Sequence, residues 1–207
     1  MANITRFADI PQFTQEGTHE CDYSLVSLVK YINEEEREYG LQLNPDFQRG
    51  HVWTEEQQIK WIEYHLRGGK SGNVIYLNYP FLHSWNEAKE GEYQDYVCVD
   101  GLQRITAARR FINNEIPAFG TYYKDFEDKL RTVNCTIRVN TNNLKTEREV
   151  LQWYIDMNDG GTPHTAEEIN KVKELIEKLN WKANAIINKN TPKIYYKSMI
   201  YNVKTRF

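Results

Sequence analysis

The feature that most constrains the fold is a strand that turns through a glycine directly into a helix. Residues 96–99 alternate as a buried strand, and Ile105 and Ala108 follow at helical spacing, with Asp100 and Gly101 in between. Such a turn leaves the first backbone N–H groups of the helix without helical partners, and the positive end of the helix dipole lies behind them. The sequence therefore predicts a phosphate-binding corner at Gly101.

Side chains next to this corner suit the same ligand. Arg104 lies in the first turn of the predicted helix, where a guanidinium can bind phosphate oxygens through two parallel hydrogen bonds. Gln103 and Thr106 offer neutral donors, and Asp100 could hold Mg²⁺ or position a water molecule. The alternative is an ordinary strand-to-helix turn with a solvated arginine, because short motifs of this kind often occur without function.

A second motif lies upstream at residues 43–53, Leu-Asn-Pro-Asp-Phe-Gln-Arg-Gly-His-Val-Trp. Pro45 directs the chain out of a short strand and into an extended loop that carries Gln48 and Arg49. We expect Arg49 to be a second phosphate-binding arginine, with Gln48 in support.

Two further carboxylates lie near these motifs. Asp46 belongs to the loop, and Glu63 lies at the edge of the apolar face of the helix that follows it. Either could serve as a general base or a metal ligand. The other interpretation makes Asp46 a turn residue and Glu63 the partner of an arginine.

Four sequence patterns occur in a fixed order. They are L-x-P-x-F-Q-R-x-x-V-W at 43–53, I-E-x-x-L at 62–66, V-D-G-x-Q-R-x-T-A at 99–107 and an N-x-G-G element that starts at Asn158. This order resembles a ParB-like family catalogued as domain of unknown function 262, the DGQR-motif domain in the N-terminal half of GmrSD-type, modification-dependent restriction enzymes. The chain departs from the pattern at Leu102, where the family usually has Gln, and at His164, where it usually has Leu.

The resemblance implies a ParB/sulfiredoxin-like fold. We expect the two arginine-bearing motifs to hold a nucleoside triphosphate with Mg²⁺ between them and to hydrolyse it, with binding without hydrolysis as the alternative. The catalytic candidates are Asp100, Arg104 and Glu63, with Asp100 as the metal ligand. The nucleotide-binding candidates are Gln48, Arg49, Gly101, Gln103, Arg104 and Thr106, with Asp46 and Asn158 as further candidates. A role in DNA processing or in restriction and anti-restriction conflict follows from the same resemblance.

Two other functions stay open at this point. Longer relatives carry a separate nuclease half, and no His-based nuclease signature follows the motifs here, so we expect the chain to work with a protein partner or not to cut DNA. One alternative is a non-enzymatic module, such as a viral or host inhibitor of a DNA-processing or defence protein. The other is a phosphotransferase that transfers phosphate from ATP to a small molecule.

The order of predicted elements indicates an α+β fold with a mixed sheet and a helical C-terminal part. Helices are expected from Ser24 to Gly40, from Thr54 to a stop at Gly68-Gly69, after Gly101 with Ile105, Ala108 and Ile112 on one face, and at 146–157 and 165–180. Strands are expected at 41–43, 73–79, 94–99 and 134–140. The expected division is an extended lead-in at 1–20, a nucleotide-binding core at 21–142 and a helical extension with a basic tail at 143–207.

Charge and composition narrow the class of protein. No signal-type segment or run of 18 apolar residues occurs, so we expect a cytoplasmic protein without a membrane span. The three cysteines are expected to be reduced, and the five histidines lack the spacing of a zinc site.

Residues 171–207 carry nine Lys or Arg against two Glu, so this tail could contact DNA phosphates. The other interpretation of the tail is a solvated helix face.

Overall fold

The computed structural model describes residues 3–10, 19–48, 50–82, 93–128, 130, 135–159 and 166–190. The chain divides into two compact units, Met1–His164 and Thr165–Phe207, which are described separately. The described part of the second unit is one helix, α5, at Ala166–Asn190. The first unit contains the sheet and the other helices.

A mixed sheet of four strands forms the centre of the first unit. The strands are β1 (His19–Tyr23), β2 (Val74–Asn78), β3 (Val97–Asp100) and β4 (Ile137–Asn142). Their order across the sheet is β1-β4-β2-β3, with the central pair β2 and β4 parallel and both outer pairs antiparallel. The α+β prediction is therefore confirmed, whereas the ParB/sulfiredoxin-like assignment stays a prediction.

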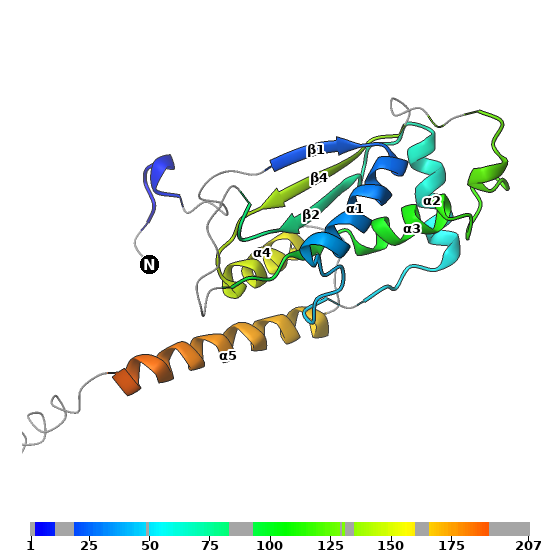
Figure 1. Ribbon diagram of the computed structural model, residues 1–207. Coiled ribbons are helices and arrows are strands. Elements are labelled where there is room, and N and C mark those ends of the chain that lie inside the picture. The colour runs from blue at the N-terminus through cyan, green and yellow to red at the C-terminus, as the bar shows by residue number, and fades with distance from the viewer. Residues whose placement is uncertain are drawn as a thin grey trace, which may run out of the picture. The chain divides into compact units, whose positions relative to one another are not determined.

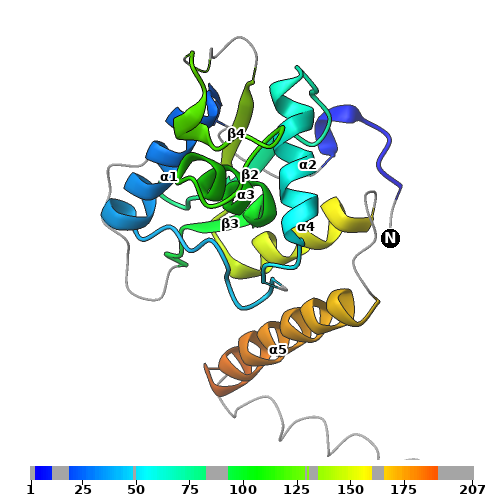
Figure 2. The same cartoon turned by 90° about the vertical axis from the view of Figure 1, so that its right-hand side faces the viewer.

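Helices cover both faces of this sheet. Figures 1 and 2 show α1 (Leu25–Tyr39), α2 (Glu55–Leu66) and α3 (Leu102–Ile112) side by side on one face, with α3 in the middle. Helix α4 (Glu147–Asp159) packs against the other face, where the rings of Tyr76 and Trp153 meet edge to face at 5.9 Å. Two short 3₁₀ helices, η1 (Phe7–Asp9) and η2 (Tyr123–Asp125), complete the described elements of this unit.

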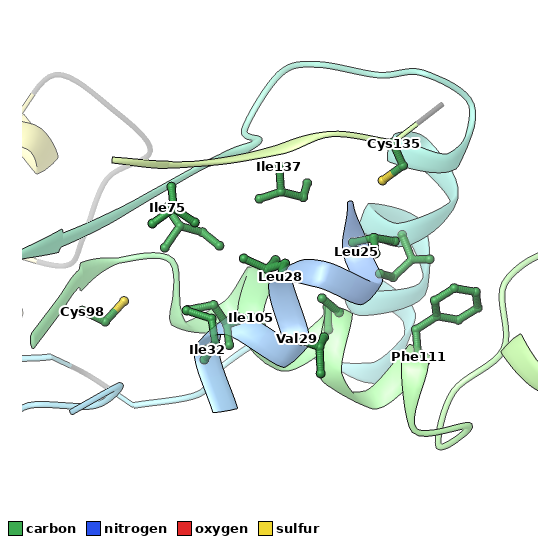
Figure 3. Close-up of a cluster of buried hydrophobic side chains, with 14 of the residues drawn as sticks. Leu25, Leu28, Val29, Ile32, Ile75, Cys98, Ile105, Phe111, Cys135 and Ile137 are labelled. Atoms are coloured by element: carbon green, nitrogen blue, oxygen red, sulfur yellow. The ribbon is translucent and has the colours of Figure 1, made fainter. Parts of the chain in front are cut away.

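The hydrophobic core lies between the three helices and the sheet. Alternate residues of β2 and β4 point toward the helices, so Ile75, Leu77 and Ile137 are fully buried. Figure 3 shows side chains of α1 and α3 closing on the strands from the other side. Burial of each such side chain contributes about 1.5 to 3 kcal/mol, so this layer fixes where β3 and α3 meet.

Local capping signals in the sequence are confirmed. Thr54 and Gln57 form the expected reciprocal capping box, with the Gln57 N–H donating to the Thr54 hydroxyl oxygen at 3.3 Å. Thr146 and Glu149 form a second one, with the same N–H to hydroxyl bond at 3.2 Å. The predicted box at Thr165 lies outside the described residues.

Several predicted strands differ from the structure. The lead-in was expected to be extended up to residue 20, but β1 begins at His19 and pairs with β4 along its whole length. It was missed because its sequence, His-Glu-Cys-Asp-Tyr, lacks an apolar alternation: Glu20 and Asp22 lie on an outer face and pair with Arg138. The predicted strand 41–43 is reduced to a single bridge between Gln42 and Val97.

Two predicted boundaries were also wrong. The strand expected at 134–140 is β4 at Ile137–Asn142, because its polar last residues find partners in β1 and β2. The last helix was expected to end near residue 180 but continues to Asn190, since nothing breaks the helix before Pro192. Within the described ranges, none of the helices has the length and apolar character that crossing a membrane requires.

Candidate functional site

The predicted glycine corner is present between β3 and α3. Gly101 is the N-cap residue of α3 and has a φ of 140°. A Cβ atom at this position would lie 2.9 Å from Cγ2 of Ile75, on the neighbouring strand β2. Glycine is therefore required both for the backbone angle and for the close approach of the turn to the sheet.

A β-bulge next to this corner determines where Asp100 points. In the pairing of β2 with β3, Leu77 lies opposite Cys98 but Tyr76 lies opposite Asp100, so Val99 is an extra residue. Because a shift of one residue moves a side chain to the other face of a sheet, the bulge places Asp100 in register with Tyr76, on the face covered by α4. Nothing in the sequence pattern indicated this irregularity.

Arg104 and Asp100 form an ion pair across the turn. The Arg104 Nη1 atom donates to Asp100 Oδ2 at 3.0 Å and to the carbonyl oxygen of Val74 at 2.8 Å. Side-chain exposure is 21% for Arg104 and 44% for Asp100, so the pair is open to a ligand on the carboxylate side. Among the described residues, Nε and Nη2 of Arg104 have no partner, which leaves three N–H groups for another acceptor.

The two glutamines of the motifs tie the upstream loop to this turn. Gln103 Oε1 accepts hydrogen bonds from the backbone N–H groups of Val52 and Trp53, both at 3.0 Å, and its Nε2 donates to the Gly50 carbonyl at 2.9 Å. In the other direction, Gln48 Nε2 donates to the carbonyl oxygens of Cys98 and Val99, the latter at 3.1 Å. The two motifs, about fifty residues apart in the sequence, thus form one structural unit.

A small pocket of about 60 Å³ lies where these parts meet. Its lining residues come from both motifs and from α4, and they are Gln48, Gly50, Val99, Asp100, Leu102, Gln103, Tyr154 and Asn158. Four of the predicted residues, Gln48, Asp100, Gln103 and Asn158, are therefore brought together. The sequence-based prediction missed Tyr154, although it lies one helical turn before Asn158 and so on the same face of α4.

Other predicted residues have different surroundings. The Thr106 hydroxyl donates to the Leu102 carbonyl at 2.8 Å, within its own helix. Asp46 belongs to a turn closed by the Gln48 N–H and the Pro45 carbonyl at 2.9 Å. Arg49 lies outside the described residues.

Glu63 lies in a separate groove. Its Oε1 accepts a hydrogen bond from the backbone N–H of Phe119 at 2.7 Å. The groove has a volume of about 590 Å³ and is lined by Lys60, Glu63, Tyr64, Arg67, Gly68 and Gly69. The structure therefore does not bring Glu63 together with Asp100 in the small pocket.

Burial shifts the pKa values of two titratable groups of this unit in the direction that favours the neutral form. Burial raises the pKa of the Cys98 thiol well above its usual range, which excludes this cysteine as a thiolate nucleophile at neutral pH. Burial also lowers the pKa of His65 on α2. This side chain is fully buried, and its Nδ1 atom lies 2.9 Å from the Trp61 carbonyl oxygen. In the described part of the chain, no three His, Cys, Asp or Glu side chains gather as a metal site. A Mg²⁺ ion at Asp100 would thus need oxygens from its ligand.

Comparison with known families identifies the unit that carries this pocket. Residues 28–176 match the model of the GmrSD restriction endonuclease N-terminal domain. The chain belongs to this family. The matched range contains both motifs and every residue that lines the small pocket, so the site is part of the GmrSD N-terminal domain itself. No curated protein and no solved structure matches the chain.

Proposed function

We propose that this GmrSD N-terminal domain binds a nucleoside triphosphate with Mg²⁺ and hydrolyses it, as the nucleotide-dependent part of a system that restricts DNA. The observation that carries the proposal is the reciprocal tie between the two glutamine–arginine motifs around one pocket. The restriction role rests on the family name and the chemistry on the site residues.

The pocket suits the terminal phosphate of a nucleotide. A volume of about 60 Å³ is too small for a base and sugar, so only one phosphoryl group would enter and the rest of the nucleotide would lie outside. The N-terminus of α3 at Gly101 supplies backbone N–H groups and the positive end of a dipole. Among the described residues Arg104 does not line the pocket, but its Nε and Nη2 have no partner there, so their three N–H groups would bind phosphate oxygens that lie outside it. Arg49 follows Gln48 directly in the sequence.

Hydrolysis would depend on position and charge. Asp100 would hold Mg²⁺ through its exposed carboxylate while Arg104 balances the charge that develops on the phosphate. Gln48 and Gln103 hold the pocket walls in place through their bonds to the other motif, Asn158 lines the pocket, and the Thr106 hydroxyl bonds within α3. Glu63 has no part in this proposal because it lines the other groove.

A direct test combines a melting assay with phosphate release. Thermal stability of the purified chain would be measured with the eight common ribo- and deoxyribonucleoside triphosphates, each with and without Mg²⁺. We expect at least one of them to raise the melting temperature, because a ligand that binds only the folded state stabilises it. Arg104→Ala should abolish the shift, whereas Arg37→Ala, which removes an exposed guanidinium on α1, should not. No shift with any nucleotide at millimolar concentration refutes the proposal.

A second candidate function is binding without turnover. The observation that favours it is that Asp100 is the one carboxylate among the described residues that line the small pocket, which leaves it alone to position a water molecule. In that case nucleotide would raise the melting temperature but no phosphate would be released. A phosphotransferase would release or transfer phosphate only when a small-molecule acceptor is added together with the nucleotide.

Contacts with DNA are proposed for the basic C-terminal part of the chain. Its described helix, α5, contains Lys171, Lys173, Lys178, Lys182 and Lys189. Phosphate contacts of this kind weaken steeply as salt rises. A protein partner that cuts DNA would complete the system.

A further inference from the structure

Gln103 is nearly saturated by the upstream loop. A glutamine amide offers two lone pairs and two N–H groups, and three of these four are used by the backbone of Gly50, Val52 and Trp53. This arrangement differs from the expected one, in which Gln103 donates to phosphate. Only one N–H group of the side chain is left for any ligand.

The loop depends on these bonds for its conformation. Among the described residues, Gln103 is the partner of three backbone groups in the segment 50–53, and Gly50 turns the chain there with a φ of 74°. In a strand, a neighbouring strand would make these bonds, so the Gln103 side chain takes the place of a sheet partner. The same loop carries Arg49 and then enters α2 at the Thr54 capping box.

We infer that Gln103 is a positioning residue: it fixes the loop segment of residues 50–53 relative to the N-terminus of α3. The inference rests on the proposed nucleotide site, which it deepens by giving Gln103 a role in arrangement instead of contact. Affinity for the nucleotide then depends on Gln103 through the position of this loop segment, whose Gly50 lines the pocket.

The chemistry of the amide makes the inference specific. In the Gln103→Glu variant the side chain would still accept from Val52 and Trp53, but its carboxylate has no hydrogen for the Gly50 carbonyl. Protonation would give the side chain that hydrogen back. The variant should therefore bind nucleotide when the new side chain is the neutral acid and fail when it is the carboxylate. Repulsion between the carboxylate and phosphate would act in the same direction, so amide exchange in the loop of the free protein, described below, decides between the two causes.

The experiment measures nucleotide affinity for wild type, Gln103→Ala and Gln103→Glu between about pH 5 and about pH 8. We expect Gln103→Ala to bind about ten- to a hundredfold more weakly at every pH, because three bonds are lost. Gln103→Glu should bind as weakly at about pH 8 and recover most of the affinity as the pH falls. Gln103→Ala with unchanged affinity, or Gln103→Glu without recovery at low pH, overturns the inference.

Other titratable and charged groups near the site also contribute to the pH dependence of nucleotide affinity, and the wild-type measurements over the same pH range account for them. Asp100 lines the pocket, and Arg104 is paired with it. His51 lies in the loop, where burial and then the nearby Arg110 lower its pKa. All of them are present in wild type and in both variants, so only the difference between Gln103→Glu and the other two proteins reports on residue 103.

Hydrogen exchange in the free protein separates this inference from the nucleotide proposal. Gln103→Ala should speed exchange of the Val52 and Trp53 amides, whereas Leu102→Ala, a change at the adjacent pocket residue, should not. If wild type binds no nucleotide but these amides lose protection, the proposed function fails and the tie stands. If Gln103→Ala weakens binding and their exchange is unchanged, Gln103 contacts the ligand directly and the inference is wrong.

Discussion

Replacement of Gly101 by alanine tests the geometry of the corner. The structure gives two separate reasons for a loss of stability: a backbone φ of 140°, which side chains rarely adopt, and a Cβ atom 2.9 Å from Ile75 Cγ2. Backbone strain of this kind costs about 1 to 3 kcal/mol, and overpacking against a buried side chain costs about 1 to 3 kcal/mol more. We expect Gly101→Ala to lower the free energy of unfolding by about 2 to 6 kcal/mol.

A matched glycine isolates the contribution of the contact. Gly72 also has a positive φ, 66°, but a Cβ there would meet nothing within 4 Å. Gly72→Ala should therefore cost only about 1 kcal/mol, from the left-handed backbone alone. Urea denaturation of both variants gives the two free energies on one scale.

A double variant tests the contact itself. Ile75→Ala removes the two side-chain atoms that would lie closest to a Cβ at position 101, so Gly101→Ala should cost about 1 to 3 kcal/mol less in that background than in wild type. If Gly101→Ala costs no more than Gly72→Ala, or if the two changes at 75 and 101 are additive, the close approach of the turn to β2 does not limit this position.

The remaining predictions concern the site and its surroundings. Arg49→Ala and Arg104→Ala should weaken nucleotide binding non-additively, since both would contact one phosphate chain. Fully additive losses of binding free energy would show that the two arginines do not share this ligand. Glu63→Ala should lower the free energy of unfolding by about 1 kcal/mol, through the lost bond to the Phe119 N–H, with nucleotide affinity unchanged; weaker binding would return Glu63 to the site. Truncation after Asn180 removes six basic residues and should reduce DNA binding and its salt dependence; equal binding by the truncated protein would exclude the tail as the DNA contact.

Local chemistry explains what could be predicted from the sequence. The capping boxes at Thr54 and Thr146 and the turn at Gly101 each involve residues within one helical turn of one another, so their patterns are visible in a linear sequence. The arrangement of the strands is different. The Asp22–Arg138 pair and the position of β1 at the edge depend on residues more than a hundred positions apart, and no local pattern encodes such a pairing.

The site shows the same division between local and distant information. The sequence motifs contained four of the residues that line the small pocket, Gln48, Asp100, Gln103 and Asn158, and phosphate binding by them stays a prediction. The sequence did not indicate the bulge at Val99 or the partners of Gln103, which exist only once the loop and the turn are adjacent. Glu63 was included because its helix follows the loop directly, yet a helix side chain points along one face only, and this one points to the other groove.

The two motifs share a dipeptide, Gln48-Arg49 and Gln103-Arg104, and the structure gives a reason for its order. In each motif the glutamine crosses to the backbone of the other one. A glutamine can do this without adding charge, because it both donates and accepts. At position 103 a lysine or glutamate would satisfy only one kind of backbone group, and in either place it would change the charge beside the Asp100–Arg104 pair. The glutamines thus hold the two motifs together, and this arrangement sets the position of the loop backbone at Gly50 relative to the turn at Asp100.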